Sequence, residues 1–196
     1  MPEIEGYESC WVTGIFHCLF CHGYEERGAK SAGLLAIDDC SPAPIALHMA
    51  RYANRLAEEV AVYTDGNEAV TEVITALLGG LEPSSKSARN ISAEARKIVR
   101  LRKLEKWAGV EVELEGGEKK VEGFLVHKPK WKVNGSFVEK LGLGVTEGGD
   151  FKVTPPLNET NVKGIFAAGD CAGPMKAAAS GGVVVVGVTA QLHAED

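Results

Sequence analysis

The sequence predicts an α/β fold built around a parallel sheet, and three consecutive segments support this prediction. Residues 32–37 form a short apolar run that stops at two aspartates, which is typical of a buried strand. Apolar residues recur at helical spacing over 45–57, and a second apolar run at 59–63 ends at the turn signal Asp65-Gly66. A strand-helix-strand unit of this kind, about thirty residues long, has parallel strands and a right-handed crossover.

Four further segments complete the expected secondary structure. Residues 67–81 are expected to form a helix that ends at two glycines. In the run 96–103, basic residues alternate with apolar ones, which favours a half-buried amphipathic helix with a solvated basic face over a phosphate-binding role. Strand-period alternation at 110–114 and the run 121–126 flank Gly116-Gly117 and predict a hairpin. Residues 164–170 are expected to be a strand that leads into a glycine turn.

The composition excludes several classes of protein. The chain has 196 residues, 45% of them hydrophobic and 24% charged, which is ordinary for a globular domain. With a net charge of -6 and no stripe of Lys and Arg, it is not expected to bind nucleic acid. The first residues do not resemble a signal peptide, and the apolar stretch 177–190 is too short to span a bilayer. Five cysteines are too few for an extracellular disulfide scaffold of this size, so a cytoplasmic protein is expected.

Cys18 and Cys21 are the strongest candidates for chemistry. Two intervening residues allow a disulfide to close across one helical turn, or allow both thiols to bind one metal ion. At the start of a helix, the backbone N–H groups and the macrodipole would lower the pKa of the first thiol. His17 and His22 flank the pair and could carry protons during thiol exchange.

Two other interpretations of the pair stay open at this point. A zinc site needs two more ligands, and Cys40 and Cys171 are distant in the sequence. The thiols could also be buried and inert, since Phe16, Leu19 and Phe20 surround them.

Two motifs, in the same order along the chain, resemble those of thioredoxin-reductase-like flavoproteins. Residues 16–25 (Phe-His-Cys-Leu-Phe-Cys-His-Gly-Tyr-Glu) are most similar to the active-site segment of the fungal dithiol oxidases that form the disulfide of epidithiodiketopiperazines such as gliotoxin. Residues 164–171 (Gly-Ile-Phe-Ala-Ala-Gly-Asp-Cys) resemble the late FAD-contacting motif of the same superfamily. The resemblance covers nearly the whole chain. It implies a pyridine-nucleotide-disulfide oxidoreductase fold, with a degenerate NAD(P)-type Rossmann-like domain over 1–127 and a remnant of the FAD domain over 128–196.

The resemblance also implies a role for each of these residues. Cys18 would exchange with a substrate dithiol, and Cys21 would face the flavin. Electrons would pass from the dithiol to the Cys18–Cys21 disulfide, then to FAD, and in the oxidase branch to oxygen. Asp170 would hold the ribityl or phosphate region of FAD. The implied cofactor-binding residues are Gly169, Asp170, Lys176 and Ala177.

The chain departs from this family pattern where NADPH would bind. After residues 32–37, where a G-x-G-x-x-G loop would approach the pyrophosphate, it has Asp38-Asp39, and two carboxylates repel a pyrophosphate. The second strand is followed by Tyr63-Thr64-Asp65-Gly66, which has no Arg for a 2′-phosphate. NADPH is therefore not expected to bind, and the dithiol oxidases do not need it.

The FAD site departs from the pattern as well. The family places a glycine-rich FAD loop upstream of the CxxC segment, where only residues 1–12 stand here. Three alternatives follow: the chain is a fragment, the missing half comes from another chain, or FAD has been abandoned. The tail 177–187, where the family has a helix pointing at the flavin, is rich in Gly and Val, which are poor helix formers.

These observations favour a thiol–disulfide oxidoreductase of the dithiol-oxidase type, acting on a small dithiol of fungal secondary metabolism. One alternative is a cofactor-free member of the fold, repurposed as a cyclase, lyase or isomerase, in which His17, His22, Asp38 or Asp39 does acid–base work. Another is a non-catalytic partner of a full-length relative. An incomplete sheet exposes apolar edges, so a homodimer or larger assembly is expected.

Overall fold

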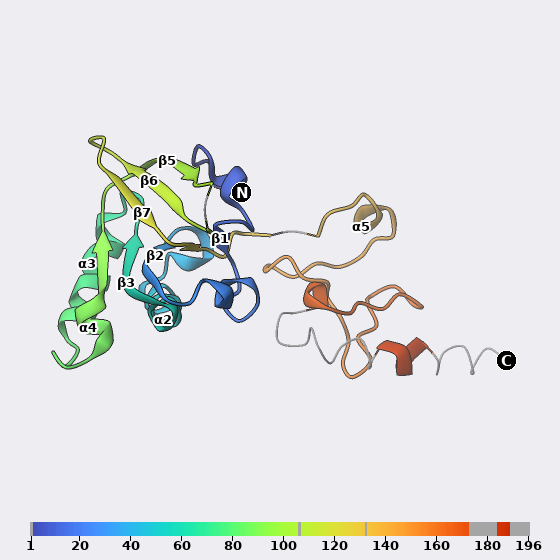
Figure 1. Cartoon of the computed structure of the whole chain (residues 1–196). Coiled ribbons are helices and arrows are strands. Elements are labelled where there is room, and N and C mark those ends of the chain that lie inside the picture. Colours follow the sequence, from blue (N-terminus) through green and yellow to red (C-terminus); the bar gives the residue numbers. More distant parts are fainter. Residues whose placement is uncertain (1, 106, 132, 173–183, 189–196) are drawn as a thin grey trace. The chain divides into compact units, whose positions relative to one another are not determined.

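The computed structural model describes residues 2–105, 107–131, 133–172 and 184–188 (Figure 1). The chain divides into two compact units, 1–130 and 131–196, and each unit is held together by contacts among its own residues. The boundary expected from the sequence, after His127, lies close to this division. Within the described ranges, no helix combines the length and the apolar composition needed to cross a bilayer.

The first unit is built on a five-stranded sheet in the order β1-β8-β2-β3-β4, in which every neighbouring pair is parallel. Its strands are β1 (Ile15–Phe16), β8 (Leu125–Val126), β2 (Ala29–Leu35), β3 (Ala57–Tyr63) and β4 (Ile91–Glu94). Helix α2 (Ala43–Leu56) connects β2 to β3, which confirms the predicted strand-helix-strand unit. Helices α3 (Glu68–Gly79) and α4 (Lys86–Asn90) lead from β3 to β4. The α/β fold predicted from the sequence is confirmed.

The two faces of this sheet bury different partners, because successive side chains of a strand point to opposite faces. Leu34 and Val62 pack against α2 and α3 in one core cluster. Leu35 and Tyr63, one position further along, belong to a second cluster with the antiparallel strands. A Cβ at Gly33 would lie 2.4 Å from Leu125 Cδ2, so glycine at this position allows β8 to pair closely with β2.

The second cluster lies between the parallel sheet and an antiparallel sheet of β5 (Ile98–Lys103), β6 (Val110–Leu114) and β7 (Lys119–Glu122). The predicted helix in the basic run is therefore wrong. A register shift between Ile98 and Arg100 leaves Ile98 and Leu101 both buried at a spacing of three, which imitates helical periodicity. The predicted hairpin is correct for β6 and β7 only, because residues 125–126 join the parallel sheet as β8.

Short helical segments complete the first unit. Helix α1 (Tyr7–Cys10) precedes β1, and two 3-10 helices, η1 (His22–Glu26) and η2 (Asp38–Cys40), lie on either side of β2. The backbone of Gly6, just before α1, has φ 80, and a Cβ there would lie 1.8 Å from the Leu101 carbonyl oxygen. Glycine is therefore required for α1 to approach β5.

The second unit has little regular structure in its described part. It contains α5 (Phe137–Lys140), the 3-10 helix η3 (Asp170–Ala172) and a small core of Leu143, Phe151, Ala167 and Ala172. The strand predicted over 164–170 is wrong, because only Phe166 makes a bridge, to Glu159, and the chain turns into η3 at Asp170. Residues 184–188 are helical despite their valines, and the rest of the tail discussed above lies outside the described residues.

Candidate functional site

Cys18 and Cys21 form a disulfide, with their Cα atoms 5.4 Å apart. The pair follows the carboxyl end of β1 and lies in turns, with Cys18 partly buried and Cys21 exposed. This accessibility contradicts the interpretation of the two cysteines as buried, inert thiols. In the described part of the chain, no group of three or more His, Cys, Asp and Glu side chains is placed to hold a metal ion.

The helix start that would lower the pKa of the Cys18 thiol is not found at this residue. No α-helix begins at this residue, and Cys21 instead precedes η1, a 3-10 helix of five residues. The macrodipole effect belongs to the first turn of an α-helix, so the condition for it is not met at Cys18. His17 and His22 are both exposed next to the disulfide, and the His17 ring centroid lies 6.0 Å from that of Trp11.

A hollow of about 170 Å³ adjoins the disulfide on its Cys18 side. Its lining residues are His17, Cys18, Leu19, Phe20, Met49, Tyr52 and Val126. Phe20 is 76% exposed, which is unusual for a large apolar side chain, and its ring packs edge-on against Tyr52 with the centroids 5.2 Å apart. The Tyr52 ring in turn meets His48 edge-on at 4.8 Å. The disulfide therefore lies beside an aromatic, mostly apolar recess that is open to solvent.

The order of the strands reverses between β8 and β2, and the crevice at the carboxyl ends of such strands is where α/β sheets bind ligands. Here Asp38 follows β2 with φ 49, in the left-handed region. Its carboxylate Oδ2 lies 4.0 Å from Nε2 of His127, which follows β8 and is fully buried. The Tyr7 hydroxyl lies 2.7 Å from His127 Nδ1. Burial lowers the pKa of His127, although the Ile37 carbonyl and the charge of Asp38 act in the opposite direction.

Sequence reasoning missed His127 as a member of this site and assigned it to a domain boundary. A histidine directly after an apolar strand was the available signal, but the run 121–126 was assigned to one hairpin strand, whereas its last two residues form β8 in the parallel sheet. Asp38 and Asp39 are both exposed, and Cys40 is buried with its Sγ accepting a hydrogen bond from the Lys128 N–H at 3.3 Å.

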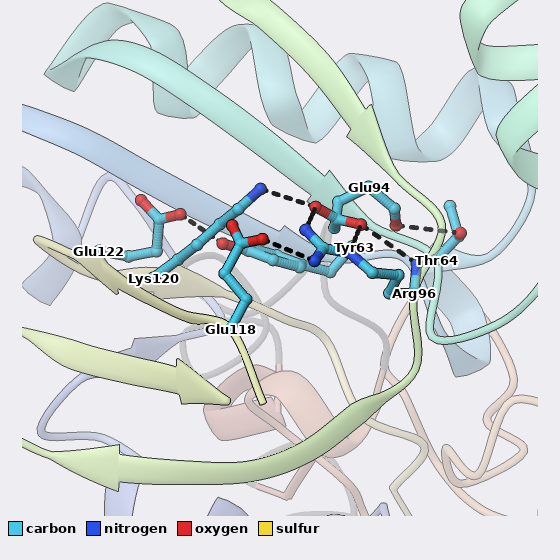
Figure 2. A network of polar contacts seen from close by, with 7 residues as sticks. All are labelled: Tyr63, Thr64, Glu94, Arg96, Glu118, Lys120 and Glu122. Atoms are coloured by element: carbon cyan, nitrogen blue, oxygen red, sulfur yellow. Dashed lines mark hydrogen bonds and ion pairs between the residues drawn. The ribbon is translucent and has the colours of Figure 1, made fainter. Parts of the chain in front are cut away.

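A network of charged side chains lies at the neighbouring ends of β3 and β4 (Figure 2). Arg96 donates to both carboxylate oxygens of Glu94, at 2.9 and 2.8 Å, and to Glu118 at 2.7 Å. Lys120 lies 2.6 Å from the same Glu94 carboxylate. These contacts, led by the Arg96 hydrogen bonds, lower the pKa of Glu94 to about 2. The Arg96 guanidinium is thus paired with carboxylates, so this member of the basic run is not free to bind a phosphate.

Beside these charged groups, Tyr63 donates a hydrogen bond of 2.5 Å to Oε1 of Glu122, which is 3% exposed. Burial raises the pKa of the Tyr63 hydroxyl, so it stays a donor. Figure 2 shows Tyr63 between Glu122 and the Glu94–Arg96 pair.

The late motif belongs to the second unit. Gly169 has φ 84, and Asp170 begins η3 with its side chain exposed. The Cys171 Sγ donates to the Ala168 carbonyl at 3.0 Å, which stabilises the turn. The other two predicted cofactor residues, Lys176 and Ala177, lie outside the described residues.

Comparison with known proteins adds a family and several relatives. Residues 43–183 match the family described as pyridine nucleotide-disulphide oxidoreductase. The chain is 41% identical to thioredoxin reductase aclD of Aspergillus oryzae, over 98% of this chain and 60% of that protein. It is also 41% identical to thioredoxin reductase sirT of Leptosphaeria maculans, over 90% of this chain and 53% of that protein. The chain thus spans little more than half the length of these relatives.

Solved structures agree at the level of the fold. An oxidoreductase from Agrobacterium tumefaciens superposes with a TM-score of 0.78 at 27% identity, over all of this chain and 62% of that one. A thioredoxin reductase TrxB from Bacillus anthracis has a TM-score of 0.77 at 22% identity, over 99% of this chain and 61% of that one.

Proposed function

Since the chain belongs to the pyridine nucleotide-disulphide oxidoreductase family, we propose that it is a thioredoxin-reductase-like oxidoreductase whose Cys18–Cys21 disulfide oxidises a small-molecule dithiol. The observation that supports this proposal most directly is the accessible disulfide bordering an apolar recess. A recess of about 170 Å³ fits part of a small molecule, and its aromatic lining would hold the apolar body of a substrate whose thiols reach Cys18.

In the proposed reaction, one substrate thiolate attacks the Cys18 Sγ, forms a mixed disulfide and releases the Cys21 thiolate. The second substrate thiolate then attacks the substrate sulfur of that mixed disulfide. This closes the substrate disulfide and releases the Cys18 thiolate, so two electrons pass from substrate to protein. The two protons of the substrate thiols end on the two cysteines, and the exposed His17 and His22 rings are placed to carry them.

A flavin would supply the reoxidation of this dithiol when bound, as the family binds FAD and NAD(P). The residues that the structure describes form only part of a flavin-binding site. Gly169 and Asp170 offer a turn with an exposed carboxylate, but no glycine-rich loop follows a strand in the described ranges to cradle the diphosphate. Asp38 stands after β2 where such a loop would approach a dinucleotide. The oxidation of the substrate dithiol by the Cys18–Cys21 disulfide therefore needs only the residues of this chain.

The test is a single-turnover oxidation with dithiothreitol as the probe dithiol. The oxidised wild-type chain is expected to convert about one equivalent of dithiothreitol to its cyclic disulfide, and both Cys18→Ser and Cys21→Ser are expected to abolish this conversion. Cys171→Ser, which removes a half-buried thiol of the second unit, is the matched control and should behave as wild type. Stoichiometric oxidation that persists in Cys18→Ser would refute the proposal.

A second candidate function is supported by Asp38 and His127. A carboxylate facing a buried imidazole in the strand-end crevice is an acid–base pair, so a cofactor-free cyclase, lyase or isomerase is the alternative. An as-purified protein that lacks flavin absorption, and whose activity on a substrate without thiols is lost in Asp38→Asn, would favour this candidate over the dithiol oxidase.

A further inference from the structure

A second hollow, of about 280 Å³, lies at the C-terminal end of α2, and its lining is basic rather than apolar. The lining residues are Arg51, Asn54, Arg55, Ser85, Lys86 and Ser87. The first three belong to α2, and the last three form the beginning of α4, which packs beside the end of α2 (Figure 1). Because α2 runs from the carboxyl end of β2 to the amino end of β3, this hollow lies at the opposite edge of the sheet from Asp38.

The charges around this hollow are not compensated. Arg51 and Arg55 are four residues apart on one helix, where like charges repel each other. Among the residues that the structure describes, Arg51, Arg55 and Lys86 form no ion pair with a carboxylate, and no carboxylate lines the hollow. Three exposed cations without a carboxylate partner in the described ranges therefore border one recess in a chain with a net charge of -6, and this local positive charge favours an anion.

Lys86 is held in place by the protein itself. Its Nζ donates to the Asn54 carbonyl, one of the last carbonyls of α2. Asn54 is 2% exposed, and its amide donates to the carbonyls of Ala57 and Glu58, which fixes the end of the helix. A purely structural role as a helix C-cap explains Lys86 but neither of the two arginines.

The hydroxyl groups at the hollow are available as well. Ser85 occupies the N-cap position of α4, yet its side chain makes no capping hydrogen bond. Its hydroxyl, like that of Ser87, can therefore donate to a ligand.

We propose that this hollow binds a small phosphate-bearing ligand. Two guanidinium groups offer paired N–H donors that match phosphate oxygens, the fixed Lys86 ammonium adds a third charge, and the serines add neutral donors. A volume of about 280 Å³ leaves room for a group attached to the phosphate. The site is separate from the disulfide and does not depend on the proposed oxidoreductase activity.

The test is a titration of the full chain with inorganic phosphate and with pyrophosphate at constant ionic strength, followed by NMR chemical shifts. Saturable binding is expected, with a dissociation constant of about 1 mM or tighter for pyrophosphate. Arg51→Gln and Arg55→Gln are each expected to weaken binding about tenfold. Arg89→Gln removes an exposed arginine of α4 that does not line the hollow, and it should bind as wild type.

Three results would overturn the proposal. One is chemical-shift changes that grow without saturation, or an Arg89→Gln variant that loses as much affinity as Arg51→Gln and Arg55→Gln do. Either result would indicate nonspecific electrostatic attraction. Another is citrate binding as tightly as pyrophosphate, which would exclude a phosphate-selective site. The third is a Lys86→Met variant that unfolds at a lower temperature yet binds pyrophosphate as wild type does, since Lys86 would then be only a helix cap.

Discussion

His127 is completely buried, and only one of its two ring nitrogens has a well-formed hydrogen bond. Its Nδ1 meets the Tyr7 hydroxyl at 2.7 Å, whereas Nε2 lies 4.0 Å from Asp38 and makes no hydrogen bond of ordinary geometry in the described part of the chain, although the Ile37 carbonyl is near the ring. Burial lowers its pKa below the ordinary value, so the native state holds the neutral ring. The unfolded chain, with the ordinary pKa of about 6.5, takes up a proton at higher pH than the folded protein does.

This difference predicts a loss of stability on mild acidification. The free energy of unfolding of the wild type should fall as the pH drops below about 6.5, by up to about 1.4 kcal/mol per pH unit until the folded pKa is reached. In His127→Gln this slope should be reduced, as measured by urea unfolding at pH 7.5 and 5.5. The control is His48→Gln, which removes an exposed histidine and should keep the wild-type slope. Equal slopes in wild type and His127→Gln would contradict the prediction.

Between elements, the Glu94 network joins the end of β4 to the antiparallel sheet. Glu94 contacts Arg96, which leads into β5, and Lys120, which lies in β7. The Glu94 side chain is only 12% exposed, so these contacts are poorly screened by solvent. Arg96 also reaches Glu118, whose side chain is 52% exposed. The network is therefore a polar link between the two sheets, beside the apolar cluster that fills the space between them.

Glu94→Gln is expected to lower the free energy of unfolding at pH 7 by about 1–3 kcal/mol, because Arg96 and Lys120 lose a charged acceptor. The pKa of Glu94 is held at about 2, below its unfolded value, so its stabilisation is present above about pH 4.5 and is lost as the pH falls toward 2. Urea unfolding at pH 7 and pH 3 measures both effects.

Glu118→Gln is the control from the same network. Its pair with Arg96 is exposed to solvent, so this substitution should lower the free energy of unfolding less than Glu94→Gln does. If the two substitutions cost the same, the link between the sheets does not depend on the burial of Glu94.

For the whole molecule, the apolar cores are divided unequally between the two units. The two larger clusters and both sheets lie within residues 1–130, whereas the described part of 131–196 has one small cluster of its own. Because a domain's stability comes mainly from its own buried apolar surface, the first unit has what it needs to fold independently.

A polypeptide of residues 1–130 is therefore expected to unfold cooperatively on heating and to form the Cys18–Cys21 disulfide. Circular dichroism in the near ultraviolet and free-thiol titration check these two outcomes. A polypeptide that melts without a cooperative transition and binds a hydrophobic dye would show that the first unit needs residues 131–196.

The sequence alone was enough for features that depend on neighbours along the chain. The β2-α2-β3 unit follows from local apolar periodicity, and the CxxC pair follows from two cysteines that are three positions apart. The family also follows from two short motifs. Their assigned roles in thiol exchange and flavin binding stay predictions.

Other features depend on contacts between distant segments, and only the tertiary structure decided them. The register shift in β5 gave a strand the spacing of a helix, and the apolar run 121–126 is divided between the two sheets, with residues 125–126 in β8. His127 meets Tyr7 across 120 residues, and Arg51 shares a hollow with Lys86 although they are far apart in the chain. The physical reason is that periodicity records which face of an element is buried, whereas burial partners and charge neighbours are set by how the elements pack.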